Sequence, residues 1–177
     1  FLPIFASKLQ ISSSQIGLIV SANVITTALL QRPFGKLADR YNKIALILFG
    51  ATLGSIALLS IPLIKTFSAL FLISLVMGLG GAISMPAASA ITVIVGQDLG
   101  MGTSMGLFNT AMSVGMVMAP LVSGLVMDYL NLSAVFIVAG LISVSGMLIF
   151  YYFVRDGMRE KNKNKFRGKN AIQRRFN

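Results

Sequence analysis

The chain has 177 residues, of which 55% are hydrophobic and only 11% are charged, and its mean hydropathy is +0.82. Soluble domains are about 25% charged, so this composition excludes a soluble globular protein, and the high hydrophobicity also excludes a disordered chain. Because the chain has no cysteine and no histidine, disulfides, thiol chemistry and zinc or haem ligation by these residues are excluded, and we expect no metal site and no cofactor.

Five apolar stretches are long enough to cross a bilayer, which takes about 20 mostly apolar residues in a helix. They predict a transmembrane bundle over residues 1–154, with spans at residues 15–34, 44–64, 67–95, 103–127 and 133–154. The spans are too long for barrel strands, and none has a charged residue in its middle. Residues 1–6 resemble the end of a further apolar segment, so we expect a fragment of a longer chain. The predicted fold is all-α, with five transmembrane helices and a partial one.

The basic residues predict the orientation of the chain in the membrane. Thirteen of the fifteen Lys and Arg residues fall on one side of the predicted spans, and only Lys8 and Lys65 fall on the other. The positive-inside rule therefore places residues 155–177 in the cytoplasm as a basic tail. This tail has the composition of a lipid-binding or nucleic-acid-binding segment, or of a solvated end that fixes topology. We favour the solvated end and expect no nucleic-acid partner.

The connection between the first two spans, residues 31–43, reads QRPFGKLADRYNK. We expect Gly35 to let the chain turn out of a helix and to let a neighbouring helix approach closely. We also expect Asp39 to cap the following helix or to pair with a basic group. A salt bridge here would form in one conformational state and break in another. The alternative is a loop with solvated charges that only sets topology.

This segment resembles motif A of the major facilitator superfamily, G-x-L-A-D-R-x-G-R-K, which lies in a cytoplasmic loop between two helices. Six positions match the motif, namely Gly35, Leu37, Ala38, Asp39, Arg40 and Lys43. Asn42 replaces the usual glycine, a mild change because Asn also adopts left-handed conformations. The resemblance implies a conformational switch that involves Gly35, Asp39, Arg40 and Lys43.

Small residues in the fourth span resemble a second pattern of the family, motif C of drug–proton antiporters, G-x8-G-x3-G-P-x2-G-G. The matching positions are Gly106, Gly115, Pro120 and Gly124, with Ala119 and Ser123 in place of two glycines. Small residues at these spacings predict a strip where helices pack closely, with no room for a bulky side chain at Gly115, and Pro120 permits a bend. The alternative is an ordinary packing face.

Family members have two similar six-helix halves, and the resemblance implies that this chain is one of them. We predict the C-terminal half, helices 8–12 with the end of helix 7, because the third span lacks Arg and the chain finishes in a basic tail. An N-terminal half that was cut in the central loop would look similar.

The resemblance implies that the first, third and fourth spans line a central cavity. Polar or flexible residues within the first and fourth spans are therefore the candidate substrate contacts: Asn23, Thr27, Gln31, Asn109 and Met112. For Asn23 and Asn109, the alternative is a hydrogen bond between helices. Gly78–Gly81 is a glycine-rich run without the lysine of a nucleotide loop, and it predicts close helix packing.

These features favour a multi-pass protein of the cell membrane that is not an enzyme, since no carboxylate lies within a span. The expected function is secondary active transport of a small molecule by alternating access, in the direction of efflux. The expected partners are the substrate, the bilayer and the remaining N-terminal half. The alternatives are an uptake transporter for a metabolite and a membrane interaction module that transports nothing.

Overall fold

Helices form nearly all of the described chain. The computed structural model describes the backbone of residues 1–176 and the side chains of residues 1–97 and 100–154. Within this part there is no β-strand, and the predicted all-α fold is confirmed. The elements are α1 (Leu2–Lys8), α2 (Ser13–Arg40), α3 (Lys43–Ser60), the 3-10 turn η1 (Ile61–Leu63), α4 (Phe67–Leu99), α5 (Met101–Tyr129) and α6 (Leu132–Phe176).

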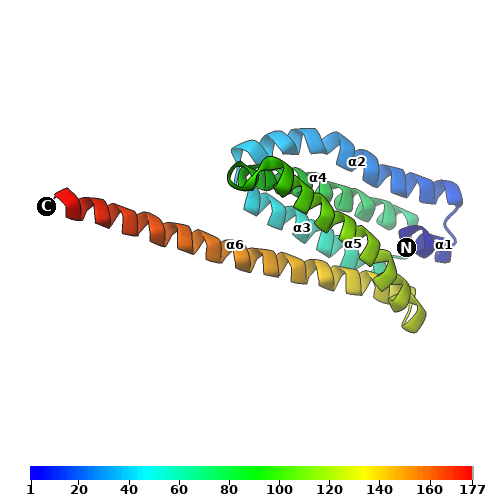
Figure 1. The fold of residues 1–177 in the computed structure, drawn as a ribbon. Coiled ribbons are helices and arrows are strands. Elements are labelled where there is room, and N and C mark those ends of the chain that lie inside the picture. Colours follow the sequence, from blue (N-terminus) through cyan, green and yellow to red (C-terminus); the bar gives the residue numbers. More distant parts are fainter. Residues whose placement is uncertain (177) are drawn as a thin grey trace.

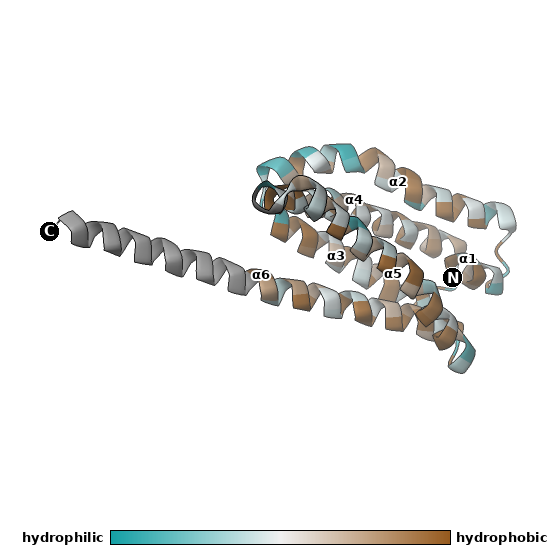
Figure 2. Cartoon of the chain, viewed as in Figure 1, coloured by the Kyte–Doolittle hydropathy of each residue, from teal (hydrophilic) through white to brown (hydrophobic). Residues whose placement is uncertain are grey.

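Five of these helices, α2 to α6, are long and apolar enough to cross a membrane. Hydrophobic residues cover their middles, whereas hydrophilic residues gather at helix ends, most clearly where α2 turns into α3 (Figure 2). The predicted basic tail, residues 155–177, lies outside the residues whose side chains the structure describes.

Polar side chains cap the starts of several helices. At the start of α2, the Ser12 hydroxyl accepts a hydrogen bond from the Gln15 N–H at 3.4 Å, and the Gln15 side chain accepts one from the Ser12 N–H at 3.2 Å. At the start of α3, Asn42 Oδ1 accepts hydrogen bonds from the N–H groups of Ile44 and Ala45, at 3.0 and 3.4 Å. Asn42, and not the predicted Asp39, therefore satisfies the free donors of α3, because it is the residue directly before the first turn.

Helix α2 continues through the segment that was predicted to be a loop. It ends at Arg40, so Gly35 lies inside the helix and does not turn the chain out of it. A helix of this length measures about 42 Å, compared with about 30 Å for the hydrocarbon core, so its polar last turns reach beyond the core. Hydropathy detects where the core ends, whereas the helix continues as long as its backbone hydrogen bonds do. The connection to α3 is only Tyr41 and Asn42.

The packed core of the bundle is a layer of four helices. Helix α4 packs against both α2 and α3, and α6 packs against α3 (Figure 1). Helices α3 and α4 cross where Gly50 faces Gly80, and a Cβ added to Gly50 would lie 2.6 Å from the Gly80 carbonyl oxygen. Only glycine permits this backbone approach. The 3-10 turn η1, the start of α6 and α1 meet in an apolar cluster that also includes Ile19 of α2 and Leu70 of α4. In this cluster the rings of Phe5 and Phe136 pack edge to face with centroids 5.4 Å apart.

Helix α5 lies at the periphery of this layer. A single residue, Gly100, connects it to α4 with φ +95°, a conformation that L residues rarely adopt. Ser104 in its first turn is buried, but the side chains from residues 113 to 121 are all exposed. Helix α5 packs at its start, where Met101 and Ser104 lie against Gly96 of α4, and near its end, where Met127 packs against the apolar cluster.

Candidate functional site

Three side chains hold α2 against α4 through hydrogen bonds to backbone carbonyls. Asn23 Nδ2 donates to the Ser74 carbonyl oxygen at 3.0 Å, and the Ser74 hydroxyl donates back to the Ile19 carbonyl oxygen at 2.9 Å. One turn further on, the Thr27 hydroxyl donates to the Gly78 carbonyl oxygen at 3.1 Å and to the Asn23 carbonyl oxygen at 2.9 Å. In hydrocarbon each of these polar groups needs such a partner, so together they fix how α2 sits on α4.

Glycine makes these hydrogen bonds possible by letting the two backbones come together. A Cβ added to Gly78 would lie 2.7 Å from the Asn23 carbonyl oxygen, which no real Cβ tolerates. The predicted close packing of the Gly78–Gly81 run is confirmed at Gly78 and Gly80. The position of Gly81 does not require glycine, because an added Cβ would make only ordinary van der Waals contacts with Thr27.

The predicted cavity residues therefore lie in different surroundings. Asn23 and Thr27 are half-buried in the contact between α2 and α4, which is the hydrogen-bonded alternative for Asn23. Gln31, further along α2, is exposed. On α5, Asn109 is exposed and Met112 is half-buried. Hence the structure uses the first two residues to join helices, while Gln31 and Asn109 keep their side chains accessible.

The end of α2 carries the motif A residues on an open, mixed-charge surface. Pro33, Lys36, Leu37, Asp39, Arg40 and Tyr41 line a depression of about 580 Å³. Beneath it, Ala38 is buried, and an added Cβ at Gly35 would lie 4.0 Å from Cβ of Pro86 on α4. Gly35 thus lies against the neighbouring helix, as predicted, whereas Asp39 and Arg40 point away from it and are exposed. Lys43, in the first turn of α3, is half-buried.

The motif C strip does not make the close helix contact that its spacing predicts. A Cβ added to Gly106, Gly115 or Gly124 would meet no atom within 4 Å among the described residues, and Pro120 is exposed. The expectation that Gly115 has no room for a bulky side chain is therefore wrong within this chain. The physical reason is that α5 stands away from its neighbours between its two attached ends. On the side towards α6, its small residues face an open groove.

Sequence reasoning missed the serine contacts that join helices. Ser74 was not singled out, although it is fully buried and serves both as donor and, through its carbonyl, as acceptor. The hydroxyls of Ser55 on α3 and Ser143 on α6 lie 2.7 Å apart, 88 residues apart in sequence. The available signal was a serine among apolar residues within a span, where a hydroxyl needs a partner.

The comparisons with known proteins agree with this arrangement. The Major Facilitator Superfamily model matches residues 1–175, and the chain belongs to this family. It is 25% identical over 162 residues to an uncharacterized MFS-type transporter of Methanocaldococcus jannaschii, a match that covers 92% of this chain and 42% of the relative. It is 22% identical over 169 residues to the multi-drug resistance efflux pump PmrA of Streptococcus pneumoniae, covering 93% of this chain and 42% of the pump.

A third relative is the quinolone resistance protein NorA of Staphylococcus aureus, which is 21% identical over 155 residues, 88% of this chain and 40% of that protein. The chain thus spans less than half the length of each of these three relatives. The family and the apolar helices make it a multi-pass protein of the plasma membrane with a half-MFS fold.

Proposed function

We propose that this chain forms one half of a secondary transporter that expels a small molecule from the cell by alternating access. The observation that carries the proposal is the charged end of α2. Asp39 and Arg40 lie exposed there, on a helix that is held to α4 by three hydrogen bonds. A rigid helix pair that ends in exposed charges can make and break ion pairs with another part of the protein as a unit. The names of PmrA and NorA favour efflux over uptake.

The chain is proposed to be the C-terminal half, helices 8–12 with the end of helix 7, rocking against an N-terminal half. Gln31, Asn109 and Met112 are proposed to face the cavity between the halves, because their side chains are at least partly accessible. Asn23 and Thr27 are proposed to shape that cavity by positioning α2. The proposed orientation has the α2–α3 turn and the C-terminus in the cytoplasm, following the thirteen basic residues on that side.

The charged end of α2 is proposed to act as the latch of this cycle. Asp39, Arg40 and Lys43 supply charges of both signs at the rim of the membrane, where an ion pair is partly screened and therefore reversible. Gly35 keeps α2 close to α4, so that movement of the latch is transmitted to the helix pair.

The test is Asp39→Asn in the full-length protein, reconstituted in vesicles and assayed for efflux of a quinolone and of a fluorescent dye. We expect transport to fall by at least about tenfold, equivalent to about 1.4 kcal/mol, while the amount of protein in the membrane stays the same. Insertion depends on the basic residues, which this change leaves in place. Asp128→Asn is the matched control, because Asp128 is an exposed aspartate at the end of α5.

Normal transport by the Asp39→Asn variant would remove the proposed latch. Absence of flux from the unaltered full-length protein, with either compound and in both directions, would contradict the transport proposal itself. Flux in the inward direction only would favour uptake.

A further inference from the structure

One row of side chains along α2 is aliphatic first and basic afterwards. Leu18, Ile25 and Leu29 are 53%, 55% and 70% exposed. Arg32 and Lys36 continue the row and are exposed as well. At about 3.6 residues per turn, these five residues lie within about 60° around the helix axis. They therefore form one continuous surface, which we call the open face of α2.

The open face points away from the surfaces of α2 that already have a role. Ile19, Asn23 and Thr27 hold α2 against α4, and the centre of the open face lies about 150° around the axis from them. Gln31, the candidate cavity residue on this helix, lies about 130° from that centre. Neither the contact with α4 nor the proposed cavity therefore accounts for the basic residues of this face.

The position of Arg32 along α2 places it at the edge of the hydrocarbon core. The residues from Ser13 to Gln31 carry no charge, and at about 1.5 Å per residue they span about 28 Å. Because the hydrocarbon core is about 30 Å thick, Arg32 lies where the lipid headgroups begin, and Lys36 lies about 6 Å further along. The headgroup layer is about 5–7 Å deep on each side. Both basic side chains therefore lie at the depth of the lipid phosphates.

The net charge of this part of the chain is positive. Residues 32–43 contain four basic side chains, Arg32, Lys36, Arg40 and Lys43, and one acidic side chain, Asp39, which gives a net charge of +3. Figure 2 shows this hydrophilic end following directly on the hydrophobic middle of α2. Each basic residue close to a membrane surface raises the affinity for anionic lipid about fivefold.

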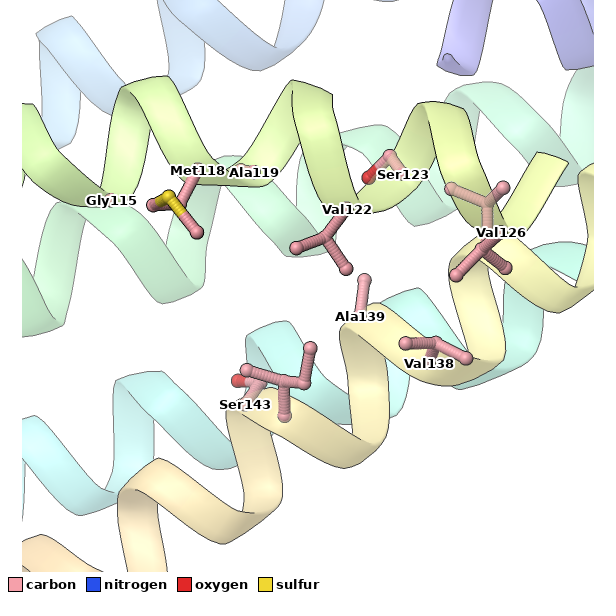
Figure 3. A pocket seen from close by; sticks show the side chains of 11 residues that line it. Gly115, Met118, Ala119, Val122, Ser123, Val126, Val138, Ala139 and Ser143 are labelled. Carbon is pink, nitrogen blue, oxygen red and sulfur yellow. The ribbon is translucent and has the colours of Figure 1, made fainter. Parts of the chain in front are cut away.

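Charge distinguishes the open face from the other apolar surface of the bundle. The groove between α5 and α6 has a volume of about 450 Å³ and is lined by apolar and hydroxyl side chains such as Val122 and Ser123 (Figure 3). Its lining contains no charged residue among those that the structure describes, so nothing in it selects a headgroup.

An anionic phospholipid has the same order of chemistry as the open face, with a hydrocarbon chain that ends in a phosphate. A protein segment that covered the face would remove both cations from water, which is costly unless an acidic group is placed against each of them. Lipid phosphates, in contrast, pair with Arg32 and Lys36 while these side chains stay in the hydrated headgroup layer. The open face therefore favours a lipid over a second protein surface.

We propose that Arg32 and Lys36 bind the phosphate of an anionic phospholipid, such as phosphatidylglycerol, whose acyl chain lies along Leu29 and Ile25. The guanidinium of Arg32 can donate two parallel hydrogen bonds to phosphate oxygens, and the Lys36 ammonium adds a second positive charge one turn further on. Arg40, about 12 Å beyond Arg32, remains with the proposed latch. This inference depends on insertion of α2 in a bilayer and not on the transport proposal.

The test uses the full-length protein in liposomes with equal amounts of phosphatidylglycerol and phosphatidylcholine. In one sample the phosphatidylglycerol carries a photoreactive diazirine near the carboxyl end of an acyl chain, and in a second sample the phosphatidylcholine carries it. After irradiation, mass spectrometry gives the ratio of phosphatidylglycerol to phosphatidylcholine labelling at Leu29 and at Leu18. Leu18 is the internal comparison, because it lies on the same face near the opposite end of α2. We expect the ratio at Leu29 to be at least about threefold higher.

Two pairs of substitutions remove the same amount of positive charge. We expect Arg32→Gln combined with Lys36→Gln to lower the ratio at Leu29 to the value at Leu18. Lys8→Gln combined with Lys65→Gln is the matched control, because both lysines are exposed at the other side of the membrane, and we expect it to leave the ratio at Leu29 unchanged. Unchanged labelling of Leu18 by phosphatidylcholine shows that each variant is inserted and folded.

Equal ratios at Leu29 and Leu18 in the unaltered protein would overturn the proposal. So would a ratio at Leu29 that the first pair of substitutions leaves in place, or that the control pair lowers to the same extent. Absence of labelling at Leu29 with either lipid would show that another protein segment covers the open face, which also contradicts lipid binding there.

Discussion

At the residue scale, the side chain of Ser74 shows how a bilayer protein uses a hydroxyl. It is completely buried, and it donates a hydrogen bond of 2.9 Å to the carbonyl oxygen of Ile19 on the neighbouring helix α2. Helices in lipid gain nothing from the hydrophobic effect when they associate, so van der Waals packing and such hydrogen bonds must supply the attraction. Together with Asn23 and Thr27, Ser74 specifies which face of α2 meets α4.

Replacing this serine should therefore weaken the bundle measurably. We expect Ser74→Ala to lower the free energy of unfolding in bicelles by about 0.6–1 kcal/mol, the usual value of an interhelical hydrogen bond in bilayers. The control is Ser145→Ala, because Ser145 is exposed and donates only to Leu141 of its own helix, at 2.8 Å. Equal effects of the two changes would contradict an interhelical role for Ser74.

At the element scale, glycine placement decides which helices touch. Gly50 and Gly80 bring the backbones of α3 and α4 together, and Gly78 does the same for α4 and α2. Gly106, Gly115 and Gly124 of α5, in contrast, have open space where a side chain would stand. Close packing therefore requires glycine at these positions of α4, whereas the glycines of α5 could carry a side chain without a clash within this chain.

This difference predicts opposite outcomes for similar substitutions. We expect Gly80→Ala to destabilise the protein by about 1–3 kcal/mol, since its Cβ would lie 2.7 Å from the Gly50 carbonyl oxygen and force α3 and α4 apart. Gly17→Ala on α2 should cause no loss of stability, because its Cβ would meet nothing within 4 Å. Thermal unfolding in detergent measures both. A Gly80→Ala protein as stable as the parent would exclude the close crossing of these helices.

At the scale of the whole molecule, the helices divide into a tightly packed layer and one loosely attached helix. Helices α2, α4, α3 and α6 form the layer in that order, and α5 lies at its periphery (Figure 1). An exposed apolar helix is stable in lipid and also offers a surface to another part of a larger protein. In the proposed half-transporter, this surface would pack against the other half of the full-length protein.

The proposal that the cavity lies between two halves predicts how residues 1–177 will insert and transport when they are expressed alone. We expect the segment to insert in the membrane and to show no transport, because the proposed cavity needs a second half opposite Gln31 and Asn109. Flux measured in vesicles that contain only the purified segment checks this, with the full-length protein as the positive control. Saturable flux from the segment alone would mean that these helices form a complete pathway and would contradict the half-transporter proposal.

Much of the fold was predictable because it depends on local sequence. The apolar stretches have the lengths of transmembrane helices, and the LADR residues of the charged segment indicated the family that the family model then showed. The boundary of α2 was not predictable in this way. Its last turns are polar, and hydropathy reports the thickness of the hydrocarbon core and not the end of a helix.

Composition, length and motif are properties read along the chain, and they sufficed to identify a bundle of membrane helices, the order of those helices and the family. The partners of individual residues became known only from the folded structure. In the structure, Asn23 and Thr27 form hydrogen bonds to α4, and Asn42 caps the start of α3. Gly115 lines a groove. The physical reason is that these contacts depend on how each helix is rotated about its own axis. In a span that is apolar on all sides, no amphipathic pattern specifies that rotation, and packing with distant segments must do so.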